Sequence, residues 1–466
     1  MTRPMPAAML PAAMLLAALP SPAQVQAGPA PASPPARKPN IIFILADDLG
    51  YGDLGCYGQK KIKTPHLDGM AAEGVRFTQV YAGSTVCAPS RCALMTGLHT
   101  GHTRVRGNAR VPLRPEDVTV AEVLKQAGYA TALVGKWGLG EPGSTGVPTR
   151  QGFDEFYGYL NQQHAHNHFP DHLWRGEEKV TIEGNVVEKG VAVRRAQWSQ
   201  DLFTREALDF VTRHKDKPFF LYLSYVVPHA NNEAGKAGIE TPDDKPYGDE
   251  PWPQNERNFA ASVTKMDADV GRLLAKLKEL GIDGETYVFF TSDNGAHREG
   301  GRDPDFFSSS GPLQGIKRSM HDGGIRVPMI VRRPGAVPAG KVSDQVWAFW
   351  DFLPTAAELA GAAAPEKIDG ISMAAALHGK PNRTADYLYW EFHERGFHQA
   401  VRTGDWKAIR SGGAAGRLRL FDLSADIAEK TDVAAKNPEV VARIEEYLKT
   451  ARTENPEFPV KLTGGK

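Results

Sequence analysis

The sequence predicts an α/β protein with a large mixed, mostly parallel sheet sandwiched by helices, and a smaller C-terminal antiparallel subdomain that carries a helix. Apolar, β-rich runs alternate with helical patterns along most of the chain, which favours a parallel sheet covered by helices. The strand candidates are apolar almost throughout, as expected of strands that are buried on both faces. From about residue 380 the candidates become short and are separated by turns.

The first elements have clear end signals. The run 41–46 is the first strand candidate. A helix follows in which Thr64 is the expected cap and Pro65 the first residue, where the missing N–H of proline has no partner to lose. Thr119 and Glu122 have the spacing of a capping box and predict the start of the next helix.

The middle of the chain supplies the rest of the large sheet. The further strand candidates are 130–134, 219–227, 287–291 and 329–331. A long helix is expected before the third of these runs, and Gly281 ends it. Its apolar face is made of Met266, Val270, Leu273, Leu274, Leu277 and Leu280.

The C-terminal region is predicted as a separate subdomain. Its short strand candidates are 387–391, 400–402, 406–410 and 418–423. Asn437 is the expected cap of a helix over 438–450. We therefore expect a large domain at 39–380, long enough to be a catalytic domain, and a C-terminal subdomain at 381–466.

The N-terminus has the pattern of a secretory signal peptide over residues 1–27. Arg3 is followed by an apolar run at 7–19 and by the small residues Ala23 and Ala27. The run is too short for a membrane span, and residues 28–38 are a Pro/Ala linker. The sequence thus predicts an exported protein, periplasmic or secreted, without stable membrane insertion; an Ala/Pro-rich tail is the alternative.

Composition narrows the function. The 466 residues carry 55 basic and 55 acidic side chains, so the net charge is zero, and nucleic acid is not expected as a partner. A small anionic substrate would need local positive charge. The chain has only 3 cysteines, which excludes a disulfide framework; Cys56 and Cys92 either pair or remain small buried thiols.

Reactive side chains follow four strand candidates at their carboxyl ends. In order along the chain they are Asp47 with Asp48, Lys136, His229, and Asp293 with Asn294. Ligands of open parallel sheets gather at this edge, so we expect one assembled site. The carboxylate and amide oxygens suit Ca²⁺ or Mg²⁺. For an isolated pair, ordinary turn chemistry is the alternative.

Cys87 begins a predicted helix in which Pro89 lies in the first turn and Arg91 lies one turn further on. A group at this position faces free backbone N–H donors and the positive end of the helix dipole. The pattern is that of an anion site. A buried structural thiol and an activated thiolate are the alternatives.

The spacing Cys87-x-Pro89-x-Arg91 resembles the signature of the type I sulfatases, a formylglycine-dependent, arylsulfatase-like family of the alkaline phosphatase superfamily. The resemblance extends from about residue 38 to the end. In that family a formylglycine-generating enzyme or maturase oxidises the cysteine to 3-oxoalanine, called formylglycine, and the hydrated aldehyde attacks sulfur. The resemblance implies hydrolysis of sulfate monoesters to an alcohol and inorganic sulfate by a gem-diol derived from Cys87.

The resemblance also implies a metal and several residue roles. The ion would be Ca²⁺ rather than Mg²⁺, held by Asp47, Asp48, Asp293, Asn294 and the modified side chain of Cys87. Arg91 would hold that side chain, and Asp293 would act as its base. Lys136 and Lys317 would bind the sulfate group, and His229 would protonate the departing alcohol.

One position departs from the family pattern. Relatives often have a histidine two residues after the lysine, where this chain has Gly138. The cluster His164-Ala165-His166-Asn167-His168 is a source of a replacement, and we predict His166. An exposed or metal-binding cluster is the alternative.

Three other functions remain open on sequence alone. A phosphoesterase or phosphonate monoester hydrolase would use the same formylglycine, a cysteine hydrolase would use the unmodified Cys87 thiol, and a catalytically impaired relative would only bind sulfated sugars. The expected substrates are sulfated carbohydrates or aryl sulfates. The aromatic residues near the expected mouth either stack on a ring of the substrate or pack in the core: Trp137, Tyr157, Tyr159, Phe169 and Trp174.

Overall fold

The computed structural model describes residues 1–5, 37–394 and 396–460, and the residues from Arg37 onward form one compact unit. The predicted signal peptide, 1–27, and the linker, 28–38, lie almost entirely outside the described residues. Within the described part, no helix is both long and apolar enough to cross a lipid bilayer. The predicted boundary after residue 380 falls inside the compact unit and stays a prediction.

The large sheet has 11 strands, and it confirms the predicted fold class. Its centre is the parallel run β10-β1-β9-β3-β4, and antiparallel strands lie on both sides of that run. The strand order is β12-β2-β11-β10-β1-β9-β3-β4-β5-β6, with β13 beside β2. The bounds are β1 Asn40–Ala46, β2 Val75–Tyr81, β3 Ala130–Lys136, β4 Glu155–Tyr159, β5 His172–Arg175, β6 Glu178–Thr181, β9 Phe219–Ser224, β10 Thr286–Ser292, β11 Arg326–Arg332, β12 Lys341–Ser343 and β13 Trp347–Ala348.

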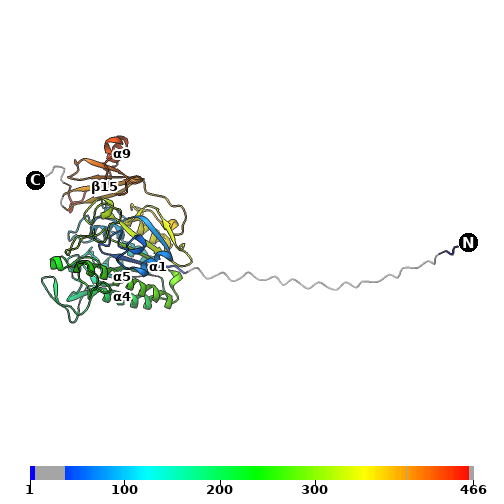
Figure 1. Cartoon of the computed structure of the whole chain (residues 1–466), viewed down its shortest axis with the longest axis horizontal. Coiled ribbons are helices and arrows are strands. Elements are labelled where there is room, and N and C mark those ends of the chain that lie inside the picture. The colour runs from blue at the N-terminus through cyan, green and yellow to red at the C-terminus, as the bar shows by residue number, and fades with distance from the viewer. Residues whose placement is uncertain (6–36, 395, 461–466) are drawn as a thin grey trace. The chain divides into compact units, whose positions relative to one another are not determined.

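Helices cover both faces of this sheet. Side chains of β1 alternate between two buried layers, with Ile42 in the layer that holds α1, α4 and α5, and Phe43 in the layer that holds α2, α3 and α7. Figure 1 shows α4 and α5 side by side, and the two helices contact each other. The helices are α1 Pro65–Ala72, α2 Cys87–Thr96, α3 Val120–Gln126, α4 Ser199–His214, α5 Gln254–Glu279, α6 Asp322–Ile325, α7 Phe352–Leu359 and α8 Ala374–Leu377.

The C-terminal region folds as the predicted antiparallel sheet with one helix, labelled β15 and α9 in Figure 1. Val440 and Ile444 of α9, Pro438–Leu448, pack on Leu420 of the sheet. The four strands are β14 Leu388–Phe392, β15 His398–Thr403, β16 Trp406–Arg410 and β17 Leu418–Asp422. A separate hairpin is formed by β7 Val186–Glu188 and β8 Val191–Arg194.

Some local expectations hold and others need correction. The capping box is confirmed, since Glu122 N–H donates to Thr119 Oγ1 at 3.2 Å and Thr119 N–H donates to Glu122 Oε2 at 2.7 Å. Thr64 and Asn437 stand at the predicted helix starts, but neither side chain caps its helix. Asn437 instead donates backward to the Val433 carbonyl at 3.0 Å. The strand predicted at 219–227 ends at 224, because the chain then leaves the ladder toward the site described below.

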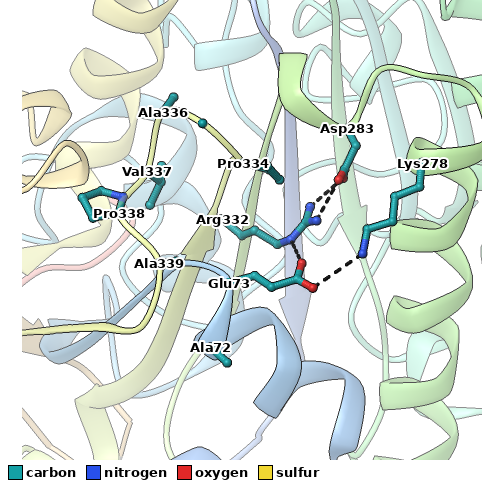
Figure 2. A pocket seen from close by; sticks show the side chains of 11 residues that line it. Ala72, Glu73, Lys278, Asp283, Arg332, Pro334, Ala336, Val337, Pro338 and Ala339 are labelled. Atoms are coloured by element: carbon teal, nitrogen blue, oxygen red, sulfur yellow. Dashed lines mark hydrogen bonds and ion pairs between the residues drawn. The ribbon is translucent and has the colours of Figure 1, made fainter.

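Opposite the carboxyl ends of the parallel strands, Arg332 at the end of β11 ties three elements together (Figure 2). Its guanidinium donates to Asp283 at 2.6 and 2.8 Å and to Glu73 at 2.6 Å. Lys278 adds a longer contact to Glu73 of 3.5 Å. These groups line a hollow of about 690 Å³. Because Arg332 is buried and each of its nitrogens is used, this cluster holds β11, α1 and α5 together.

We expect Glu391 on β14 to make stability depend on pH. Burial alone would raise the pKa of this carboxyl, but the bond from His393 and the charges of Arg106 and Arg452 lower it to about 2. A depressed pKa gives stability that is present above the ordinary value and lost as the pH falls toward about 2. Glu391→Gln should lower the unfolding free energy at pH 7 by about 3 kcal/mol.

Urea unfolding at pH 7 and at pH values down to 3 measures this effect. The difference between the wild type and Glu391→Gln should shrink as the pH falls, because the carboxyl of the unfolded wild-type chain, with its ordinary pKa, takes up a proton before the folded one does. Glu446→Gln, an exposed glutamate paired with Lys449, is the matched control and should change little. A difference that stays constant with pH would contradict the prediction.

Candidate active site

The predicted polar strand ends meet at one edge of the large sheet. Asp47 and Asp48 directly follow β1, Lys136 is the last residue of β3, and Asp293 directly follows β10. Lys136 Nζ lies 2.6 Å from Asp47 Oδ2, and the Asp48 N–H donates to Asp293 Oδ1 at 3.1 Å. The parallel ladders put these ends together because neighbouring parallel strands end at the same edge.

Three carboxylates face three cationic side chains here, and all six side chains are buried. Arg91 of α2 donates to Asp293 Oδ2 at 2.8 and 3.1 Å and lies 3.4 Å from Asp47. Lys317 Nζ donates to Asp48 Oδ2 at 2.8 Å. The charges are therefore balanced, and a bound anion would need an added cation to keep that balance.

The carboxylates have unusual protonation properties. Burial and the charge of Asp47 raise the pKa of Asp293 to about 7. Burial alone would also raise the pKa of Asp47, but Lys136 and the other nearby cations hold it well below its ordinary value. Asp48 has a φ of +66°, a backbone conformation that costs a non-glycine residue about 1 kcal/mol or more. Such strain at three crowded carboxylates indicates a functional site rather than a structural one.

These residues fit a divalent cation with hard oxygen ligands. Asn294 donates through Nδ2 to Asp48 Oδ1 at 2.7 Å, while its Oδ1 is buried and has no hydrogen-bond partner among the described residues. Asp47, Asp48, Cys87 and His229 each offer a ligand atom within 4.8 Å of the others. A cation at the carboxylates would use the unpartnered amide oxygen and would release Lys136 and Lys317 to bind an anion.

Cys87 is the first residue of α2 and lies in the same cluster. Its Sγ donates to Asp47 Oδ1 at 3.3 Å, and its side chain is almost fully buried. Burial and the charge of Asp47 raise the pKa of the Cys87 thiol well above its ordinary value. No histidine is hydrogen-bonded to this sulfur in the described part of the chain. The arrangement does not favour an activated thiolate, because burial and Asp47 keep the sulfur protonated although Lys136 and Lys317 lie nearby.

His229 lies beyond β9 and contacts the second lysine. Its Nδ1 donates to the Ala230 carbonyl at 2.6 Å, so Nε2 is the acceptor of the bond from Lys317 Nζ at 3.2 Å. Burial and Lys317 lower the pKa of His229 well below its ordinary value. Glu299 also binds Lys317, at 2.9 Å, and Arg318. Sequence reasoning missed Glu299, although it follows Asp293 by only six residues.

Gly138 has a φ of +86°, and another side chain fills the space where its Cβ would lie. A Cβ added there would lie 2.1 Å from Gln162 Nε2, so the Gln162 amide occupies the space beside Gly138. That Nε2 is buried without a partner among the described residues. His166 lies in the same hollow, with its ring stacked on His229 at 5.0 Å and its Nδ1 3.0 Å from Glu233. Gln162 was not predicted.

A hollow of about 350 Å³ gives access to this cluster. Cys87, Gly138, Gln162, His166, His229 and Lys317 line it. Of the five aromatic residues proposed for the mouth, four are buried in the core, as the alternative interpretation predicts. Only Trp174 on β5 remains half-buried, and it lines a neighbouring hollow. Cys56 and Cys92 are free thiols in the structure.

Comparison with known proteins places the chain among enzymes. The family described as "Sulfatase" matches residues 39–362, and "N-sulphoglucosamine sulphohydrolase, C-terminal" matches 316–454. N-acetylgalactosamine-6-O-sulfatase of Bacteroides thetaiotaomicron is 31% identical, covering 90% of this chain and 94% of the relative. Steryl-sulfatase of Mus musculus is 34% identical, covering 82% and 72%.

A solved structure gives the same result at the level of the fold. The structure described as Ps i-CgsB in complex with k-i-k-neocarrahexaose superimposes with a TM-score of 0.76 at 30% identity, covering 91% of this chain and 95% of that one. Fold and site define a hydrolase that acts on anionic esters. The family and relative matches are more specific: the chain belongs to the type I sulfatase family. It is accordingly a sulfuric ester hydrolase, which releases inorganic sulfate from sulfate esters.

Proposed function

We propose that the protein hydrolyses sulfate monoesters of saccharides with a formylglycine derived from Cys87 and a divalent cation. One observation carries the proposal most strongly. Cys87 begins a buried helix and touches Asp47 inside a cluster whose three carboxylates and three cations are balanced before any ligand binds. This arrangement suits the joint binding of a cation and a sulfate ester.

The ligands of the cation would be Asp47, Asp48, Asp293, Asn294 and the modified side chain at position 87. We propose Ca²⁺, because every protein ligand is a hard oxygen and no thiolate or imidazole cluster suited to zinc is required. The ion would polarise oxygens of the substrate and of the modified residue. A hydrated aldehyde at position 87 would supply two hydroxyls on one carbon, one for attack and one for release of sulfate.

The remaining steps fall to the chain's own residues. Arg91, fixed by Asp293 and by the Lys136 carbonyl at 2.9 Å, would orient the side chain at position 87. Lys136 and Lys317 would bind the equatorial sulfate oxygens once they are released from the carboxylates. Asp293 would accept the proton of the attacking hydroxyl.

The departing alcohol needs a proton. His229 Nε2 accepts from Lys317 in the structure, so the protonated member of this pair is the lysine. We propose that the Lys317–His229 pair together gives the proton to the leaving oxygen, with Glu299 holding Lys317 in place. This modifies the expectation that His229 carries the proton alone.

The saccharide part of the proposal comes from the relatives. The bacterial relative is named for N-acetylgalactosamine 6-O-sulfate, and Ps i-CgsB was solved with a neocarrahexaose. We propose further that the chain is exported through its N-terminal signal pattern, to the periplasm or the outside, and that a formylglycine-generating enzyme or maturase acts on Cys87 during biogenesis.

Matched esters test the function. Protein whose aldehyde at position 87 is verified by peptide mass analysis should cleave 4-nitrophenyl sulfate and N-acetylgalactosamine 6-sulfate with a much higher kcat/KM than 4-nitrophenyl phosphate or a phenyl phosphonate monoester. Faster cleavage of the phosphorus esters would show the alternative function, that of a phosphoesterase or phosphonate monoester hydrolase. Binding of sulfated sugars without turnover of any ester would show a catalytically impaired relative.

Two variants compare the side chains near Gly138. We propose that Gln162 Nε2 donates to the bound sulfate or the modified side chain, so Gln162→Ala should lower kcat/KM about 10²-fold. His166→Ala should lower kcat by a similar factor if His166 acts as a base in sulfate release. Gln126→Ala, at an exposed glutamine of α3 that does not line the hollow, is the control. Near-normal turnover of His166→Ala would remove the proposal for His166, and near-normal turnover of Gln162→Ala that for Gln162.

A further inference from the structure

The catalytic hollow lies beside a second hollow of about 380 Å³. The two share one wall, made of Arg110, Glu141, Asn161, Gln163 and Glu233. Each volume is near the lower end of the range for small-molecule sites, about 300–1,000 Å³. A ligand with its sulfate group at Cys87 and a length of more than one ring would therefore extend across this wall.

The second hollow combines an aromatic side chain with hydrogen-bonding groups. Trp174 on β5 is half-buried, and His172 packs against its ring edge-on, with centroids 6.0 Å apart. His164 stacks on His172 at 4.2 Å, and the Nε2 of His164 is buried without a partner among the described residues. Lys189, in the turn between β7 and β8, lines the same hollow. An aromatic face beside polar groups suits a ring with apolar C–H faces and equatorial hydroxyls.

The carboxylates of the hollow already have hydrogen-bond or ion-pair partners. Glu141 accepts from Asn161 Nδ2 at 3.0 Å, Glu233 contacts His166 at 3.0 Å, and Asp171 contacts His172 at 2.6 Å. With its carboxylates used in this way, the hollow offers no free acidic group for a cationic ligand. The groups left without partners are neutral or basic, which suits a neutral or anionic sugar.

We infer that the second hollow binds the sugar next to the sulfated one, so that the substrate is a glycan of at least two residues. The inference rests on the proposed function, because it takes the sulfate position from Cys87 and its cluster. It adds the substrate length and the residues that recognise the second sugar, Trp174, His164 and Lys189.

Substrate pairs of different length test the inference on aldehyde-bearing protein. The probes are N-acetylgalactosamine 6-sulfate, a disaccharide and a tetrasaccharide that carry it, a sulfated neocarrahexaose, and 4-nitrophenyl sulfate as a one-ring reference. Whichever of these glycans the protein cleaves, Trp174→Ala should lower kcat/KM on the form with two or more sugars. The loss should be about tenfold greater than the loss on 4-nitrophenyl sulfate. Lys189→Ala should shift the same ratio in the same direction. Arg175→Ala is the matched control, because Arg175 follows Trp174 on β5 but does not line the hollow.

The outcomes separate the two proposals. No turnover of any sulfate ester by wild-type protein would overturn the proposed function itself. Turnover of the reference with no gain from a second sugar, or equal losses on all substrates in Trp174→Ala and Lys189→Ala, would overturn the second-sugar site alone. Thermal unfolding of each variant identifies a folding defect. Binding of the tetrasaccharide to Cys87→Ala protein, with and without Trp174→Ala, then tests the second-sugar site without turnover.

Discussion

Replacement of Cys87 by alanine is expected to remove sulfate ester hydrolysis, with a fall in kcat/KM of at least about 10⁴-fold. The proposed nucleophile is made from this side chain, and among the described residues no other cysteine, serine or threonine side chain is hydrogen-bonded to the Asp47 carboxylate. The alanine variant should keep its fold, because alanine is a good helix former and only a small buried group is removed. Steady-state turnover of 4-nitrophenyl sulfate measures the loss.

The control for Cys87→Ala is Cys92→Ala on the same helix. Cys92 is equally buried but packs in the apolar layer and does not line the hollow, so its loss should lower stability slightly and leave turnover near normal. A second measurement follows the modification itself. Activity should rise in proportion to the fraction of position 87 found as aldehyde when the host supplies more maturase. An intact thiol at position 87 in fully active protein would contradict the formylglycine proposal.

The proposed oxygen ligands could be placed at one edge of the sheet from sequence because each follows a continuous apolar strand. The apolar run of β1 predicts a buried strand. In a parallel sheet the carboxyl ends of the strands share one edge, so Asp47 and Asp48 are expected at that edge. Local sequence therefore carried long-range information at these positions. Cys87 was singled out by the family resemblance of its motif, and Pro89 predicted that it lies in the first turn of a helix.

Gln162 could not be found in the same way. It follows β4, a strand of five residues that contains Gly158 and has no long apolar run, so no strand was predicted there. Without the strand, the amides after it do not stand out as residues of the sheet edge. Lys317 belongs to no helix or strand, and its place depends on the bond of its N–H to the Ala296 carbonyl at 2.8 Å. Only the family resemblance indicated it.

The direction of β11 and the existence of β2 could not be predicted from the local sequence pattern either. β2 mixes buried and half-buried residues, and its antiparallel pairing with β11 connects it to the centre of the sheet. That pairing brings together segments about 250 residues apart, and their apolar pattern is the same for either direction. Four of the five proposed cation ligands follow strands of the parallel centre, namely Asp47, Asp48, Asp293 and Asn294, and only the side chain at position 87 comes from α2, after β2.

Removal of the divalent cation is expected to abolish activity and to lower stability at the same time. With a chelator, the carboxylates would again bind Lys136 and Lys317, as they do in the structure, and the lysines would be lost to the substrate. Ca²⁺ at a hundredfold excess over its Kd should restore turnover and raise the unfolding free energy by about 2.7 kcal/mol. Thermal unfolding in chelator and in Ca²⁺ measures the second effect without any substrate.

A variant of Asn294, the proposed amide ligand, tests where the cation binds. Asn294→Asp places a fourth carboxylate beside Asp47, Asp48 and Asp293, so it should destabilise the protein in chelator by about 2 kcal/mol through like-charge repulsion and burial. Added Ca²⁺ should restore more stability to this variant than to the wild type, because the bound cation compensates the extra charge. Cys87→Ala should retain most of the Ca²⁺-dependent gain while remaining inactive, and Asp305→Asn, at an exposed carboxylate, should behave like the wild type. If Ca²⁺ stabilised the wild type and Asn294→Asp equally, the cation would lie elsewhere, and the charge balance of the cluster would be a feature of the fold and not of catalysis.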